Sequence, residues 1–195
     1  YGYYFYYLKP LIEEMFSVRV YIRKRNDRNS YYLSFEQKGA MNFLLKKGLQ
    51  RGIKNDLKLL NFPKKQNVSS FLRGLFDTDG TLKFSKQSKE INYYPRIGFA
   101  FKSTPFSFRL GELFDKFEFN YGRWYDEDYG QWCYQISGGD NLEKWIKLVG
   151  MSNPVHYSKY LFWKEHGYCI PRSTLNARLG ALSLKTEDCF RNMAT

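Results

Sequence analysis

An order of helix, two strands and helix occurs twice in this chain, and this repeat constrains its fold more than any other feature. Residues 5–50 and 106–151 align without a gap at an offset of 101 residues, or of 102 at the last helix. The aligned pairs are Ile12 with Leu113, Phe16 with Phe117, Tyr31 with Trp132 and Phe35 with Ile136, then Phe43 with Trp145 and Gly48 with Gly150. Few residues are identical, but order and spacing agree. We therefore interpret the chain as a duplication of one α/β unit.

The first copy is predicted from two kinds of hydrophobic periodicity, one helical and one alternating. The expected elements are a helix over residues 3–16, strands over 18–25 and 31–35, and a helix over 40–47. We expect the first helix to start near Lys9, because Pro10 is unfavourable inside a helix.

The second copy follows a further helix and two strands. The expected elements are a helix over residues 71–78, strands over 81–87 and 94–102, a helix over 106–117, strands over 119–125 and 131–136, and a helix over 141–148. Ser69 and Ser70 are candidate caps of the helix that Gly80 ends. The resulting order is αββαββα. The residues of the first copy that would match 71–104 fall before Tyr1, so we expect an N-terminal truncation in preference to a degenerate first copy.

The charge of the chain is large and uneven. Its net charge is +12, and its first 65 residues hold 14 of the 31 Lys and Arg residues but 5 of the 19 Asp and Glu residues. This excess predicts a polyanionic partner, with nucleic acid ahead of an anionic membrane surface. A generic basic protein is the plain alternative.

The sequence shows no sign of a membrane protein or a secreted one. No apolar run approaches the roughly 18–20 residues of a membrane span, and no signal-peptide pattern is present. We expect a soluble intracellular protein, in the cytoplasm and nucleoid or in an organelle matrix. Three cysteines at irregular spacing argue against a disulfide framework, and with the two histidines they match no zinc motif; these residues are Cys133, Cys169, Cys189, His156 and His166.

The most specific motif is FLRGLFDTDG at residues 71–80. It resembles the signature helix of the LAGLIDADG homing endonucleases, with Leu72 to Gly80 on the nine signature positions. Both glycines, both aspartates and both leucines are kept, and the departures are Arg73, Phe76 and Thr78. The resemblance implies an α+β fold of duplicated αββαββα units with antiparallel, saddle-shaped sheets.

Two carboxylates, Asp77 and Asp79, stand at the C-terminal end of the motif helix, where the helix dipole is negative. A divalent cation would offset this repulsion, and hard oxygen ligands suit Mg²⁺. The resemblance implies that Asp79 is the catalytic metal ligand, that Thr78 lies beside it in the metal site, and that Asp77 is structural. Gly74 and Thr78 form a flat face for a second helix. The plain alternative is a helix that ends at Gly80 in ordinary Asp-Gly turn chemistry.

Two lysines occupy equivalent positions in the two copies. Lys58 and Lys159 are 101 residues apart and follow the last helix of each unit. Members of the family place a basic residue of the catalytic pocket in this region, so both are candidates for neutralising charge on the scissile phosphate. Two surface lysines that coincide by chance are the alternative.

Polar residues that alternate along the predicted strands are the candidates for DNA contact. A curved sheet in the major groove presents every second side chain to the bases and phosphates. The candidates are Arg19, Tyr21, Arg23, Arg25, Lys83, Ser85, Gln87, Arg96, Lys102, Arg123 and Tyr125. A solvated sheet surface is the alternative.

We therefore predict an intron-encoded DNA endonuclease that cuts both strands of a long pseudo-palindromic target with Mg²⁺, as a monomer acting as a pseudo-dimer. The expected parts are an incomplete half at residues 1–66, a second half at 67–152 with the motif helix at 71–80, and a helical tail at 153–195. Because the chain carries one motif acid, an intron maturase that binds RNA without cleavage is the alternative function. A DNA-binding regulator of the same fold is the third.

Overall fold

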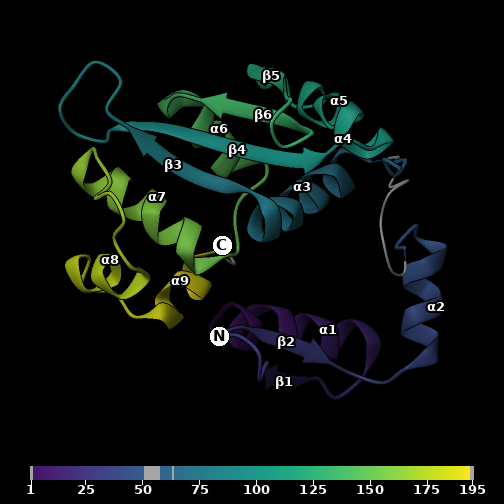
Figure 1. The fold of residues 1–195 in the computed structure, drawn as a ribbon. Helices are drawn as coiled ribbons and strands as arrows, with labels where there is room; N and C mark the ends of the chain where they lie inside the picture. Colours follow the sequence, from purple (N-terminus) through teal and green to yellow (C-terminus); the bar gives the residue numbers. More distant parts are fainter. Residues whose placement is uncertain (1, 51–57, 63, 194–195) are drawn as a thin grey trace. The chain divides into compact units, whose positions relative to one another are not determined.

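The computed structural model describes residues 2–50, 58–62 and 64–193, without the side chains of 190–193. They form two compact units (Figure 1). Unit 1 contains Tyr1–Lys54 and Thr186–Thr195, and unit 2 contains Asn55–Lys185. The predicted C-terminal tail is therefore divided between the two units, and its last helix belongs with the N-terminal part of the chain.

Unit 2 is built on a four-stranded antiparallel sheet with the order β3-β4-β6-β5. The strands are β3 (Thr81–Ser85), β4 (Tyr94–Lys102), β5 (Tyr121–Asp126) and β6 (Gln131–Ser137). The helices are α3 (Lys65–Asp79), α4 (Pro105–Arg109), α5 (Gly111–Asp115), α6 (Gly139–Leu148), α7 (Pro154–His166) and α8 (Leu175–Ala181). The short helices α4 and α5 together occupy the predicted helix 106–117, so α3 to α6 follow the predicted αββαββα order.

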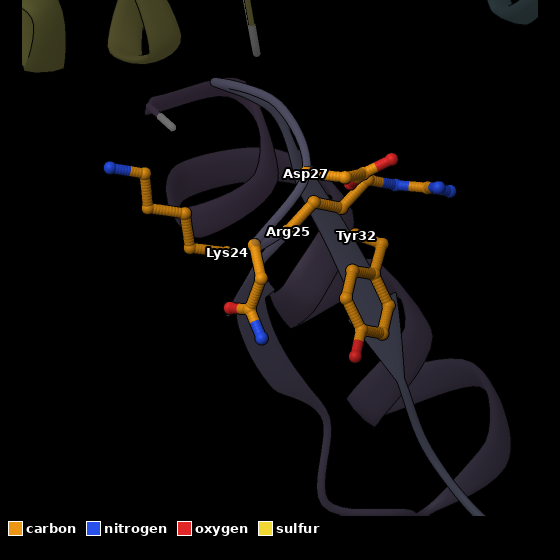
Figure 2. Close-up of a pocket in the computed structure, with 5 residues that line it drawn as sticks. Lys24, Arg25, Asp27 and Tyr32 are labelled. Atoms are coloured by element: carbon orange, nitrogen blue, oxygen red, sulfur yellow. The ribbon is translucent and has the colours of Figure 1, made fainter.

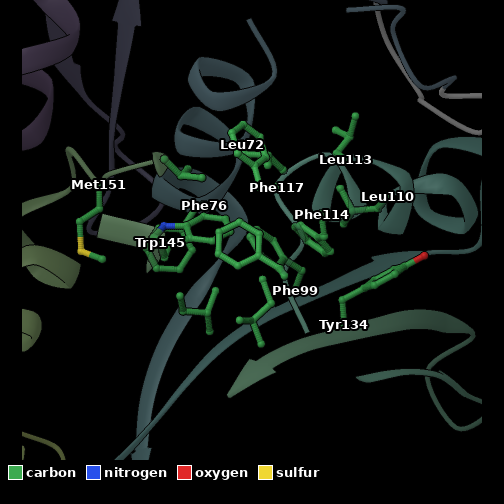
Figure 3. Close-up of a cluster of buried hydrophobic side chains, with 14 of the residues drawn as sticks. Leu72, Phe76, Phe99, Leu110, Leu113, Phe114, Phe117, Tyr134, Trp145 and Met151 are labelled. Atoms are coloured by element: carbon green, nitrogen blue, oxygen red, sulfur yellow. The ribbon is translucent and has the colours of Figure 1, made fainter. Parts of the chain in front are cut away.

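The core of unit 2 lies between one face of this sheet and helices α3 to α6 (Figure 3). Phe76 of α3 and Trp145 of α6 are fully buried, and their ring centroids lie 5.3 Å apart. Phe99 of β4 packs against both rings. Burying a large apolar side chain contributes about 2–3 kcal/mol, so this contact fixes the C-terminal half of α3 against the sheet.

Helix α3 starts earlier than predicted. Ser69 and Ser70 lie inside the helix, which begins at Lys65 without a side-chain cap. The cause is packing, because the fully buried residues of α3 recur every four positions from before Ser69 onward; they are Val68, Leu72 and Phe76. Ser69 Oγ instead donates a hydrogen bond to the Leu148 carbonyl at 2.7 Å.

The end of α3 is where predicted, at Gly80. Its backbone is extended, with φ −80° and ψ 166°, and its N–H donates to the Phe76 carbonyl. A Cβ atom at this position would lie 2.4 Å from the ring of Phe76 and 2.7 Å from its carbonyl oxygen. Glycine is therefore needed for the close approach of the chain to Phe76 as it passes directly from α3 into β3.

Unit 1 shows the order of helix, hairpin and helix. Its elements are a π-helical turn η1 (Tyr4–Leu8), α1 (Lys9–Phe16), β1 (Tyr21–Lys24), β2 (Tyr31–Ser34), α2 (Lys38–Lys46) and α9 (Thr186–Met193). Pro10 is the second residue of α1, but η1 precedes α1 directly, so the helical stretch runs from Gly2 to Phe16 and the expected helix start near Lys9 is corrected. The Tyr6 hydroxyl donates to Glu187 at 2.8 Å, which joins α9 to η1.

The repeat read from the sequence recurs in these elements. Shifted by 101 residues, β1, β2 and α2 fall on residues 122–125, 132–135 and 139–147, which lie within β5, β6 and α6. Both sheets are antiparallel and are combined with helices, so the predicted α+β class is confirmed. In the described part of the chain, no helix combines the length and apolar character that a membrane crossing requires.

Candidate active site and nucleic-acid interface

Asp79 is the last residue of α3, and its side chain is exposed. The hydroxyl oxygen of Thr78 lies 2.8 Å from Asp79 Oδ2 and 3.0 Å from the carbonyl oxygen of Gly74. The carboxylate thus stands free of the core at the negative end of a helix. Its role as a metal ligand, with Thr78 beside it, stays a prediction.

Asp77 has very different surroundings, since it is only 3% exposed and joins α3 to the start of α7. Its Oδ1 accepts hydrogen bonds from the backbone N–H groups of Ser152 and Asn153, each at 2.9 Å. In return, the side-chain amide of Asn153 donates to the Asp77 carbonyl at 2.8 Å. We call this reciprocal set the α3–α7 clamp. Burial raises the pKa of Asp77 to about 6, while the N–H donors act in the opposite direction.

Lys159 lies on α7 and reaches toward β3. Its Nζ donates to the carbonyl of Leu82 at 2.9 Å, three residues after Asp79. The side chain is half-buried, and burial lowers the pKa of Lys159, with a further lowering from the charge of Arg178. This candidate thus lies at the beginning of the strand that the motif helix leads into.

Lys58 lies in a different setting. It is an exposed residue of an irregular segment of unit 2, whereas Lys159 lies inside a helix. The structure therefore gives the two lysines no common local geometry, although the repeat places them at equivalent positions. Lys58 follows α2 and Lys159 follows α6, as the repeat predicts, and a role for either lysine in a catalytic pocket stays a prediction.

His156 lies between the candidate lysine and the core. It is 9% exposed, its ring centroid is 4.7 Å from that of Phe76, and its Nδ1 has no hydrogen-bond partner among the described residues. Burial, and then the charges of Lys159 and Arg178, lower the pKa of His156 to about 4. The imidazole is therefore neutral at pH 7.

We expect His156→Phe to remove a loss of stability at acid pH. The unfolded chain binds a proton at this histidine near pH 6.5, but the folded chain does so only near pH 4. The folded pKa is depressed, so this group lowers the free energy of unfolding as the pH falls from 6.5 to 4, by about 2 kcal/mol between pH 7 and pH 5. Urea unfolding at both pH values measures the difference. Between pH 7 and pH 5, the free energy of unfolding of His156→Phe should fall by about 2 kcal/mol less than that of wild type. The exposed control His166→Phe should show the same fall as wild type. Equal losses in wild type and His156→Phe would contradict this account.

The face of the four-stranded sheet that is not packed on α3 to α6 carries most of the predicted DNA-contact residues of unit 2. Directly paired residues of antiparallel strands share a face, and Thr81, Lys83 and Ser85 pair with Gly98, Arg96 and Tyr94. We call this surface the open face; its residues are Thr81, Lys83, Ser85, Tyr94, Arg96, Gly98, Ala100, Lys102, Gly122, Trp124, Asp126, Gln131, Cys133, Gln135 and Ser137.

Three of the predicted contact residues form one hydrogen-bonded group at an edge of the open face. Arg96 Nε donates to Ser85 Oγ at 3.1 Å, and its Nη2 donates to Gln87 Oε1 at 3.0 Å. The guanidinium also lies 5.8 Å from the ring centroid of Tyr94. These contacts hold Arg96 in a defined orientation on the surface.

Arg123 and Tyr125 require a correction, because the register places them on the other face of the sheet. Arg123 pairs with Tyr134 and Tyr125 with Trp132, and Tyr134 is a core residue. The Arg123 guanidinium lies 4.8 Å from the ring of Trp132 and 5.0 Å from that of Phe108. The prediction assumed that Arg123 and Tyr125 lie on the polar face of β5. The pairing of β5 with β6 shows that they lie on the face that carries Tyr134.

Sequence reasoning missed the residues of β5 and β6 that do lie on the open face. Trp124 is 47% exposed there, and the half-buried Gln131 and Gln135 line the neighbouring strand. A signal for them was present, because the polar residues of β6 alternate with the apolar Trp132, Tyr134 and Ile136.

The hairpin of unit 1 carries the other four predicted contact residues. Tyr21 and Arg23 pair with Ser34 and Tyr32 and so share one face. The guanidinium groups of Arg19 and Arg23 lie 5.3 and 5.9 Å from the Tyr21 ring, and that of Arg25 lies 5.7 Å from the Tyr32 ring. A shallow hollow at the tip of the hairpin is shown in Figure 2, and its lining residues are Lys24, Arg25, Asn26, Asp27 and Tyr32. This exposed surface combines arginines with tyrosine rings.

Asp79 is the candidate ligand for a divalent cation that the motif indicates. In the described ranges, no group of three or more His, Cys, Asp or Glu residues is placed to hold a metal ion. The Asp79 carboxylate is an exposed hard-oxygen donor, which fits Mg²⁺ as a single ligand beside water, phosphate oxygens or a further acid. Cys133, Cys169 and Cys189 are buried free thiols.

Comparison with known protein families gives a match within unit 2. Residues 66–150 match the model of a family described as a LAGLIDADG-like domain. The match begins within the first turn of α3 and ends just after α6, so it covers the αββαββα unit. A search of curated proteins finds no match to the chain.

Proposed function

Because residues 66–150 match the LAGLIDADG-like domain model, we propose that this chain is a DNA endonuclease that uses a divalent cation, in the manner of a homing endonuclease. The match supports nucleic-acid binding of the homing-endonuclease or maturase type. The observation that supports cleavage is the exposed Asp79 carboxylate, held at the junction of α3 and β3 by the packing of Phe76 and the close turn at Gly80.

The open face is the surface that we propose for duplex binding. It carries Lys83, Arg96 and Lys102, which can neutralise phosphates, and Gln131 and Gln135, whose amides can pair with adenine in the major groove. Exposed Trp124 adds a ring that can contact bases or thymine methyl groups. The Arg-rich hairpin of unit 1 supplies a second basic strand pair of the same kind.

The chemistry that we propose divides between two residues of the chain. Asp79 holds the cation, which when bound supplies an activated water and neutralises charge on the scissile phosphate. Lys159 is half-buried and donates to the carbonyl of Leu82, which is three residues after Asp79 in the sequence. It contributes positive charge near the reacting phosphate. The α3–α7 clamp sets the distance between the helices that carry them.

The exposed side of α3 supports the further proposal that a second motif-like helix packs there. Gly74 and Thr78 are exposed one turn apart, and a Cβ atom at Gly74 would meet no other described atom within 4 Å. A second helix in close contact could supply the second acid that cutting both strands requires. Monomer action as a pseudo-dimer, with Mg²⁺ as the cation, belongs to the same proposal.

The two faces of β5 test the binding proposal. We expect Trp124→Ala to weaken binding of a selected duplex about tenfold, because truncating a large aromatic anchor of an interface commonly costs more than about 1 kcal/mol. The matched control is the neighbouring Arg123→Ala, which lies on the other face and should change affinity less than twofold. Fluorescence anisotropy with a duplex selected from a randomised library measures both. A larger loss for Arg123→Ala than for Trp124→Ala would exclude the open face as the binding surface.

A maturase that binds intron RNA without cleavage is the second candidate, and one observation favours it. The exposed hairpin surface of unit 1 combines arginines with tyrosine rings, which can stack on the bases of single-stranded RNA. Mg²⁺-dependent nicking of the selected duplex supports the nuclease. Binding of the intron transcript without nicking of DNA supports the maturase.

A further inference from the structure

Arg178 of α8 is a buried guanidinium that joins three parts of unit 2. It is 1% exposed, and its Nε donates to Ser158 Oγ at 3.0 Å while its Nη2 donates to the Val155 carbonyl at 3.2 Å, both on α7. Its Nη1 donates to the carbonyl and to the hydroxyl oxygen of Ser173, in the loop before α8. The planar fork of arginine suits such simultaneous contacts, which lysine cannot reproduce.

These contacts fix the part of α7 that carries Lys159. Val155 lies four residues before Lys159, and Ser158 lies one residue before it. Arg178 therefore forms hydrogen bonds with the turn of α7 from which the Lys159 side chain extends to Leu82. The α3–α7 clamp holds the N-terminal end of the same helix through Ser152 and Asn153. Helix α7 is therefore held at one end by the motif helix and at its middle by α8.

Arg178 also influences Lys159 electrostatically. Burial and Arg178 lower the pKa of Lys159, Lys83 of β3 adds to the lowering, and Cys169 acts in the opposite direction. His156, on the same helix, is subject to the charges of both Lys159 and Arg178.

We infer that Arg178 is a positioning residue of the cleavage site, which holds α7 so that Lys159 lies against β3 beside the acidic end of the motif helix. The inference rests on the proposed function. It extends the site past the family match, which ends at residue 150, into helices α7 and α8, which sequence reasoning treats as packing.

The test uses the full chain with Arg178→Met, Arg178→Lys and the exposed control Arg172→Met. We expect Arg178→Met to lower kcat for nicking of the selected duplex about 100-fold, because small displacements of a catalytic group have effects of this size. KM should stay within about twofold, since binding does not use this residue. The kcat of Arg178→Lys should lie between those of Arg178→Met and wild type, and the kcat of Arg172→Met should equal that of wild type.

A second readout does not depend on cleavage. Competitive acetylation by acetic anhydride across a pH series, read by peptide mass spectrometry, gives the half-reaction pH of each lysine. Because burial is the largest cause of the lowered pKa of Lys159 and Arg178 the next, Arg178→Met should raise the half-reaction pH of Lys159 above its wild-type value without cancelling the whole lowering. Arg178→Lys keeps the positive charge but not the planar fork of contacts, so a changed half-reaction pH of Lys159 in this variant as well shows that the lysine has moved, whereas a change in Arg178→Met alone shows an effect of charge and counts against positioning.

If Arg178→Met does not fold, Ser158→Ala takes its place, since it removes one partner of the guanidinium and should lower kcat about fivefold. A folded variant with unchanged kcat and unchanged Lys159 labelling overturns the inference. If wild type nicks no DNA, the proposed function fails, while the labelling of Lys159 still decides whether Arg178 positions that lysine.

Discussion

Asp79→Asn is expected to abolish nicking of the selected duplex and to leave its binding largely intact. The amide keeps the shape of the side chain but loses the negative charge that a divalent cation requires, so we expect the rate to fall about 1,000-fold or more. Asp79 is exposed and outside the core, so the variant should fold as wild type. Nicking assays in Mg²⁺ and anisotropy on the same duplex measure the two effects.

The control for this variant is Asp128→Asn, an exposed aspartate in the turn between β5 and β6. It makes the same chemical change away from α3 and should leave both rate and affinity unchanged. Loss of binding with retained nicking in Asp79→Asn would show that this carboxylate acts in recognition and not in chemistry.

Asp77→Ala is expected to have the largest effect on stability. It removes the buried acceptor of the α3–α7 clamp and leaves the N–H groups of Ser152 and Asn153 without their partner. Unsatisfied buried donors of this kind cost about 1–3 kcal/mol each, so we expect a total loss near 3 kcal/mol and a fall in Tm of about 10 °C.

Calorimetry or thermal circular dichroism measures this loss, with Asp128→Ala as the matched control at an exposed site. Asp77→Asn is informative as well, because its amide keeps one acceptor oxygen but brings a donor toward the two N–H groups, and it should lie between alanine and wild type. A Tm for Asp77→Ala within 2 °C of the control would show that the clamp contributes little.

Periodicity predicted the elements of this chain well, and their ends less well. The alternating strands of unit 2 and the repeat at 101 residues depend on local pattern, and both recur in the structure. Helix α3 begins earlier than predicted because Val68 packs into the core, and capping preferences cannot express that long-range contact. Sequence spacing also says nothing of the partners of Asp77, which lie 75 and 76 residues away.

The candidate site was predicted where it depends on local sequence pattern and missed where it depends on long-range contacts. The motif located Asp79 and Asp77, and alternation located Lys83, Ser85 and Arg96. For β5, the short strand gives no internal reference for its two faces, so Arg123 and Tyr125 were assigned to the wrong face; only the register with β6 determines it. Arg178 was missed because a lone arginine in a tail has no sequence signal, and its importance comes from its contacts with α7.

The central claim is that Asp79 holds a divalent cation against nucleic acid, and metal-directed cleavage of the protein itself tests it most directly. Fe²⁺ replaces Mg²⁺ in the complex with the selected duplex, ascorbate and peroxide generate hydroxyl radicals at the bound metal, and mass spectrometry locates the cuts. We predict backbone cuts close to Asp79 that excess Mg²⁺ suppresses and that Asp79→Asn abolishes. Cuts that cluster elsewhere, or that persist unchanged in Asp79→Asn, would contradict the account.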